Sequence, residues 1–341
     1  MRIKRLMPLA AAGLLFAGAA EALDIKLADT FGPTEGALDG TAEILSFTPD
    51  ENTLLSTMAG SDGFGVQIMT LGADGSLSPR GIATFNDVFN DLGTTVDSAS
   101  STAVDPLQRG FGAVSLIPTD NGGTEGKVAF FDYSGSTGDT DRTLAVVNVG
   151  FHPDSVTFSA DGSKLYVANE GEFTSGGDSD APGSISVIDL SGIATLADFG
   201  GLGDGDVTTT DFSGEDLSGL RFNDLTFTPG NAYRHVEPEY VIEKDGKVFV
   251  SLQENNALAE FDPTAGTWTI QPLGTIEQLI DASDRDGGPD PDDPSELLPA
   301  AKIDDLVKGM PMPDAIAAFA DRLIADFDVR GSDRAPNVTP W

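Results

Sequence analysis

The sequence predicts an all-β protein built as a β-propeller, because two signatures recur along its 341 residues. Strands that repeat at intervals of roughly 40–50 residues are typical of propeller blades. A β-sandwich is the alternative, but it does not require the signatures to recur. Proline followed by an acidic residue opens three segments, Pro153-Asp154, Pro238-Glu239 and Pro313-Asp314. Alternating apolar residues ending in aspartate close three others, GKVAFFD at 126–132, GSISVID at 183–189 and NALAEFD at 256–262.

Segment 152–172 carries the clearest hairpin signal. Two strand patterns in it flank Asp161-Gly162, and Asp-Gly between β-rich runs favours a tight turn. The same order recurs at 237–262, with the turn at Asp245-Gly246. We expect residues 152–189 and 237–262 each to supply most of one blade of four antiparallel strands.

The remaining strand patterns and their connections follow in chain order. Apolar residues at Ile316, Phe319, Leu323 and Phe327 have the spacing of a helix within 314–329. Earlier strand patterns lie at 43–50, 53–58, 66–71, 101–104 and 112–117. Gly- and Asp-rich insertions stretch the repeats at about 174–182, 192–234 and 281–300.

The amino terminus has the pattern of a secretory signal peptide. Basic residues at 2–5 precede an apolar run over 6–20, and Ala20-Glu21-Ala22 fits a cleavage site. We therefore expect residues 1–22 to be removed and 23–40 to form a leader, with the mature protein secreted or periplasmic. No later segment is long and apolar enough to predict a membrane span.

Charge and cysteine content exclude several classes of function. The chain has 55 acidic and 19 basic residues, a net charge of −36, so it repels nucleic acid and anionic membranes. It contains no cysteine, which excludes thiol catalysis and cysteine-bound zinc. The expected partner is an extracellular ligand or an envelope component of unknown identity.

Acidic residues recur at equivalent places in the repeats and predict a cation site. Innermost blade strands surround a central channel, where converging carboxylates repel one another unless a cation such as Ca²⁺ or Mg²⁺ binds them. The alternative is that each acid caps nearby backbone. The predicted metal ligands are Asp154, Glu170, Glu239, Glu254 and Asp314. Further predicted ligand-binding residues are Glu43, His152, Asn169, Glu172, Glu237 and Asn255.

Other motifs give little sign of catalysis. A second acidic cluster over 284–293 departs from the EF-hand pattern and favours a solvated loop. The nucleophile elbow, the zinc-protease helix and the phosphate-binding loop have no match. His152 and His235 are the only histidines, so a catalytic triad would have to use one of them.

Four motifs together resemble the choice-of-anchor I family of exported bacterial β-propellers. They are HPDSVTFSADGSKLYVANEGE (152–172), EPEYVIEKDGKVFVSLQENNALAEFD (237–262), DASDRDGG (281–288) and GMPMPDAIAAF (309–319). The resemblance implies a WD40-like, seven-bladed propeller over 41–319, tethered outside the cytoplasm by a variable C-terminal anchor. The family is similar to mesenchyme-specific cell-surface glycoproteins, and its members are often labelled alkaline phosphatase. Since members continue past the last motif, we expect an incomplete ring here and a divergent tail over 320–341.

Two functions are consistent with these observations. The favoured one is an exported binding or scaffold module without turnover. The alternative is a metal-dependent phosphoesterase in which channel carboxylates hold a cation and a bound water attacks phosphorus. Fold resemblance alone does not establish chemistry, so whether the protein is an enzyme stays open at this point.

Overall fold

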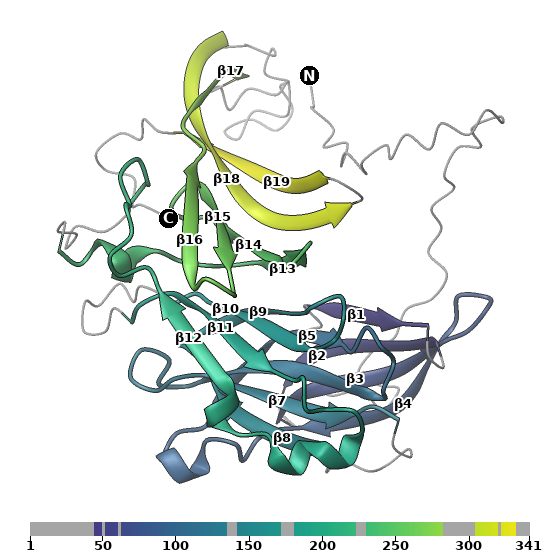
Figure 1. Ribbon diagram of the computed structural model, residues 1–341. Coiled ribbons are helices and arrows are strands. Elements are labelled where there is room, and N and C mark those ends of the chain that lie inside the picture. Colours follow the sequence, from purple (N-terminus) through teal and green to yellow (C-terminus); the bar gives the residue numbers. More distant parts are fainter. Residues whose placement is uncertain are drawn as a thin grey trace, which may run out of the picture.

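The computed structural model describes residues 44–49, 52–60, 63–134, 142–171, 181–222, 230–281, 304–319 and 322–331. Within these ranges the chain forms successive antiparallel sheets, four of four strands and one of three (Figure 1). The predicted signal peptide (1–22) and leader (23–40) lie outside the described residues. None of the described helices has the length and apolar character needed to cross a membrane.

Each four-stranded sheet uses strands that follow one another in the chain. The first contains β1 (Leu45–Thr48), β2 (Thr53–Gly60), β3 (Gly63–Leu71) and β4 (Leu77–Thr84). The second contains β5 (Val96–Val104), β6 (Phe111–Pro118), β7 (Lys127–Asp132) and β8 (Thr143–Asn148). The third contains β9 (Pro153–Phe158), β10 (Lys164–Asn169), β11 (Ser184–Asp189) and β12 (Val207–Asp211). The fourth contains β13 (Val241–Lys244), β14 (Lys247–Leu252), β15 (Ala257–Asp262) and β16 (Thr267–Pro272).

The last sheet has three strands, and short 3-10 helices occupy some connections. The sheet consists of β17 (Ile276–Asp281), β18 (Asp304–Phe319) and β19 (Arg322–Gly331). The 3-10 helices are η3 (Asn90–Leu92), η4 (Leu196–Gly201), η5 (Asp204–Asp206) and η6 (Ala232–His235).

The sheets are arranged as propeller blades. The first strand of each blade contacts the first strand of the next, in the order β1, β5, β9 and β13, and β13 contacts β18. Neighbouring innermost strands are the defining feature of a propeller, because they bring equivalent positions of successive blades to one axis. The predicted all-β propeller class is therefore confirmed, and 152–189 and 237–262 each supply three strands of a blade.

The two Asp-Gly sequences form the predicted hairpin turns. Asp245 and Gly246 connect β13 to β14 with φ angles of 54° and 78°, the positive pair that a type I′ turn requires. Asp161 lies in the longer turn between β9 and β10, where its carboxylate accepts hydrogen bonds from Ser159 and Ser163. These bonds, with the Ser163 backbone N–H first, lower the pKa of Asp161 to about 2.

Apolar clusters fill the spaces between neighbouring blades. One cluster joins the first and second blades, another the second and third, and another the third and fourth. Burial of these side chains supplies the main driving force for stacking blades in a chain that contains no cysteine. Examples from opposite sides of the three interfaces are Leu55 and Val114, Phe130 and Leu165, and Ile185 and Val250.

The two repeated signatures meet across the blade interfaces. A Cβ atom at Gly126, just before β7, would overlap the ring of Pro153 at the start of the next blade. A Cβ atom at Gly183, just before β11, would likewise overlap Val236 O and approach the Pro238 ring. At these two interfaces the glycine before the closing strand leaves room for the following blade and its opening proline.

The helix predicted within 314–329 is wrong, because this segment lies in β18 and β19. The two strands pair antiparallel from Gly309 with Gly331 to Phe319 with Arg322, with a register shift between Pro313 and Ala315. Leu323, Ala325, Phe327 and Val329 also alternate with other residues at a period of two, which suits a strand. The pairing of the two strands therefore outweighs the helical spacing of the apolar residues.

Candidate metal centre

A tight loop between β8 and β9 places the first candidate residue. Its last residue, His152, has a φ of 48°, an uncommon conformation for a non-glycine residue. The Glu170 N–H donates to His152 O at 2.8 Å, and the Gly171 N–H donates to Phe151 O at 3.1 Å. These bonds hold the end of β10 against the loop, so Glu170 lies beside His152.

A buried asparagine fixes the other side of the same loop. Asn169 is 0% exposed and accepts a hydrogen bond from the Gly150 N–H at 3.1 Å. Its Nδ2 donates to Ser184 Oγ and Ser186 Oγ on β11. A Cβ atom at Gly150 would lie 2.6 Å from Asn169 Cγ, so the loop can approach this closely only with glycine.

Three side chains converge above this support. His152, Asp154 and Glu170 each offer one ligand atom, and these three atoms lie within 4.8 Å of one another. His152 Nε2 is 3.5 Å from Glu170 Oε2, and both side chains are largely buried, at 16% and 18% exposure. An imidazole and two carboxylates at this spacing form a donor set that fits a divalent cation.

A residue of the second blade completes the surroundings. Asn121, in the loop after β6, places Nδ2 3.2 Å from His152 Nδ1. The amide of an asparagine can be assigned either way round. With Oδ1 toward the ring, Asn121 would accept from Nδ1–H and leave Nε2 as the metal-binding nitrogen, the usual support for a ligating histidine.

The predicted acids of the fourth blade have different surroundings. Arg221 NH1 lies 3.7 Å from Glu254 Oε2 and also donates to Glu254 O at 3.0 Å. The Glu239 N–H, just before β13, donates to Ser251 O on β14. Across the part of the chain that the structure describes, neither acid belongs to a group of three metal-type side chains.

The remaining predicted site residues divide into structural groups and undescribed ones. Asn255, 1% exposed, accepts from the Glu237 N–H at 2.9 Å and donates to His235 O at 2.7 Å, so it orders backbone. Asp314 lies in β18, without a described side chain. Glu43, Glu172 and the acidic cluster 284–293 lie outside the described residues.

Sequence reasoning selected His152, Asp154 and Glu170 but missed Asn121. Asn121 belongs to no repeated signature, and it lies in the polar loop 119–126 that connects β6 to β7. Its position beside His152 depends on how the second and third blades pack. The sequence contains no signal that would have found it.

Comparison with known proteins gives a family and distant structural likenesses. The model of the choice-of-anchor I domain matches residues 43–322. No curated protein matches the chain.

The solved structures that resemble the chain share little sequence with it. A protein of unknown function from Bacteroides caccae has a TM-score of 0.36 and 10% identity, covering 71% of this chain and 68% of its own. Apo AztD from Citrobacter koseri has a TM-score of 0.38 and 11% identity, covering 70% of this chain and 48% of its own. A putative 6-phosphogluconolactonase from Bacteroides uniformis has a TM-score of 0.35 and 12% identity, covering 67% of this chain and 53% of its own. The chain thus spans about half the length of the latter two.

Proposed function

Because the chain belongs to the choice-of-anchor I family, we propose that it is an exported β-propeller that acts as a cation-dependent binding module. His152, Asp154 and Glu170 hold the cation at the junction of the second and third blades. The observation that carries the proposal is the convergence of their three ligand atoms within 4.8 Å. The signal-peptide pattern at 1–22 supports export.

The donor set favours a first-row transition cation over calcium. Calcium prefers six to eight oxygen ligands, whereas imidazole with carboxylates suits Mn²⁺ or Zn²⁺. The deep negative charge of the chain, −36, raises the local concentration of every cation and does not select among them. Selectivity must therefore come from the His152 nitrogen.

The open coordination positions of the proposed cation support a binding role. Three protein donors leave coordination positions open on a cation that prefers four to six ligands. Oxygen atoms of an external ligand would occupy those positions, so the cation would serve as the contact point. The blades supply a rigid support for it, since Asn169 anchors the loop from below.

The direct test is titration of the purified protein with Mn²⁺ in 0.15 M salt, following the EPR signal of free Mn²⁺. We expect one tight site, weakened at least about tenfold by Glu170→Gln and by His152→Asn. Asparagine keeps the positive φ at position 152 accessible. The matched controls Glu254→Gln and Glu239→Gln should bind as the wild type does.

Other results would contradict the proposal. If Glu254→Gln weakens the tight site as much as Glu170→Gln does, the loss comes from surface charge. If no variant changes the binding, the cation lies elsewhere. A preference for Ca²⁺ over Mn²⁺ and Zn²⁺ in competition would remove His152 from the ligand set.

A metal-dependent phosphoesterase is the second candidate, favoured by the same open coordination positions. A cation with an open position can hold a water molecule and lower its pKa so that it attacks phosphorus. The test is hydrolysis of a chromogenic phosphate ester with Mn²⁺, Zn²⁺ or Ca²⁺. Turnover that Glu170→Gln abolishes, and that Glu254→Gln leaves unchanged, would show that the protein is a phosphoesterase and not a binding module.

A further inference from the structure

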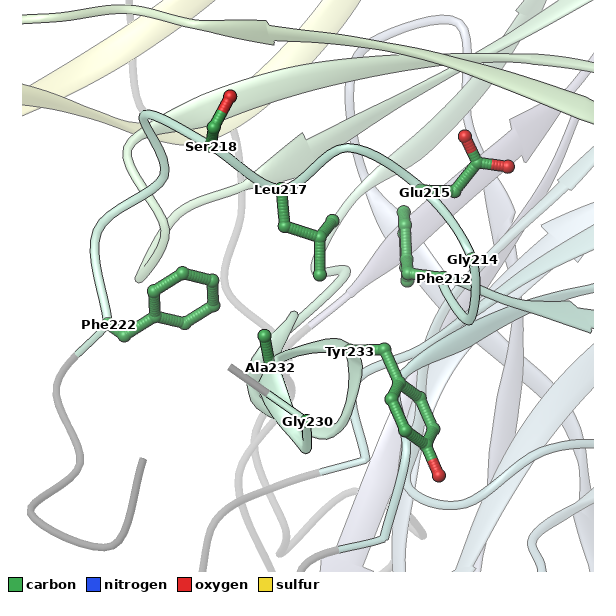
Figure 2. A pocket seen from close by; sticks show the side chains of 9 residues that line it. All are labelled: Phe212, Gly214, Glu215, Leu217, Ser218, Phe222, Gly230, Ala232 and Tyr233. Atoms are coloured by element: carbon green, nitrogen blue, oxygen red, sulfur yellow. The ribbon is translucent and has the colours of Figure 1, made fainter. Parts of the chain in front are cut away.

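A cavity of about 450 Å³ is lined by described residues at the end of the β12 segment and in the connection to β13, and residues of the candidate metal centre are not among them. This volume is in the range of small-molecule sites. Figure 2 shows Leu217, Phe222 and Ala232 facing a common space, with Phe212 and Tyr233 beside it. The described lining is thus formed mainly by apolar and aromatic side chains.

The floor of the cavity is rigid. Phe212 is fully buried and stacks on Trp268, with ring centroids 4.3 Å apart and planes at 26°. Trp268 is itself fixed, because its Nε1–H donates to Asp211 O at 3.1 Å. The buried Phe212 ring therefore supports the cavity wall from within the core, and the partly exposed side chains are the ones that a ligand can contact.

One buried asparagine ties both walls to the fourth blade. Asn255 Nδ2 donates to Arg221 O at 3.0 Å on the Phe222 side, and to His235 O at 2.7 Å at the end of η6. The Arg221 N–H donates in turn to Asn255 O at 3.0 Å. The two walls are held apart by the fold before any ligand arrives, which reduces the entropy that binding must overcome.

We propose that this cavity binds the aromatic ring system of a small ligand without negative charge. Ring stacking against Phe222 and Tyr233, which are both partly exposed, suits a flat aromatic group. The Glu215 carboxylate lies at the edge of the space, and the chain as a whole carries −36, so a carboxylate-bearing ligand is repelled. The site is separate from the metal centre, and its occupant needs no cation.

The test uses two probes with the same ring, 2-(2-naphthyl)ethanol and 2-naphthylacetate. Their binding to the full chain is measured by saturation-transfer NMR. We expect the alcohol to bind at one site and the acid at least about tenfold more weakly. Phe222→Ser should weaken the alcohol at least about tenfold. Phe47→Ser is the matched control, because it removes an exposed phenylalanine from β1 of the first blade.

A filling variant keeps the test decisive if Phe222→Ser unfolds. Ala232→Leu adds a side chain inside the cavity and removes no packing group, so it should block the alcohol and leave the Mn²⁺ titration unchanged. Glu215→Gln should reduce the difference in affinity between the alcohol and the acid. Absence of alcohol binding at millimolar concentration, or equal loss in Phe47→Ser, or full binding in Ala232→Leu would overturn the proposal.

Discussion

The third and fourth blades open with the same signature and support it in the same way, yet they leave their acids in different surroundings. Asn169 binds the Gly150 N–H before β9, and Asn255 binds the Glu237 N–H before β13. Both asparagines are buried, Asn169 as the last residue of β10 and Asn255 in the turn that follows β14. The backbone support is therefore a property of the repeat.

The acids near these asparagines find different partners. Glu170 lies with His152 and Asp154 in a group that can hold a cation. Glu254 lies beside the Arg221 guanidinium, which supplies the positive charge from within the chain. A repeated backbone thus does not repeat the chemistry, because the neutralising group comes from the connecting loops.

The largest effect should come from the shared support. Asn169→Ala removes the acceptor of Gly150 N–H and the donor to two serine hydroxyls inside the core. Leaving such buried groups unpaired should cost about 3 kcal/mol of unfolding free energy, measured by urea denaturation. Asn148→Ala is the control, since its amide bonds the exposed Asp204 carboxylate. Equal losses in the two variants would show that Asn169 is no anchor.

The next largest effect should be the stabilisation by a bound cation, which should depend on the third blade and not on the fourth. At a hundredfold excess over its dissociation constant, Mn²⁺ should raise the unfolding free energy of the wild type by about 2.7 kcal/mol. Glu254→Gln should retain this gain, whereas Glu170→Gln should lose it. A gain that persists in Glu170→Gln, measured by the same urea titration, would make the third blade no different from the fourth.

The glycines at the blade interfaces should give a smaller effect. Gly126→Ala and Gly183→Ala each force a methyl group into the next blade, so we expect each to cost about 2 kcal/mol of unfolding free energy. Gly192→Ala, where a Cβ atom would meet nothing within 4 Å, should change stability by less than about 0.5 kcal/mol. Thermal unfolding of the three variants checks this order, and a cost confined to one interface would contradict the shared role.

The smallest effect concerns the hairpin turns. Hydrogen bonds lower the pKa of Asp161 from 3.8 to about 2 in the third blade. Because the folded pKa is the lower one, the carboxylate stabilises the protein above about pH 4 and loses this contribution as the pH falls toward 2. The side chain is exposed, so solvent screening keeps the effect small.

Comparison of the wild type with Asp161→Asn in urea between pH 2.5 and 6 measures this contribution. The advantage of the wild type at pH 6 should shrink as the pH falls. Ser163→Ala removes the hydroxyl donor to the same carboxylate and should reduce this pH dependence. A pH-independent difference in Asp161→Asn would mean that its ionisation does not contribute.

Local signals in the sequence were sufficient for the blades. Asp245-Gly246 predicts its own turn, because both residues accept positive φ, and the alternating patterns around it predict the strands. The antiparallel return of the hairpin also predicted that Asp154 and Glu170 meet, since both lie at its open end. The segment 314–329 misled this reasoning, because the pairing of β18 with β19 in a hairpin outweighed a helical spacing.

Tertiary structure alone decided the partners of those acids. Asn121 reaches His152 across 31 residues, and Arg221 reaches Glu254 across 33, each from a connection that carries neither repeated signature. The wall of the cavity at Phe212 likewise depends on tertiary packing, because Phe212 stacks on Trp268 of the next blade. Turns and strand faces depend on neighbours in the chain, whereas charge partners and cavities depend on which loops meet when the blades stack.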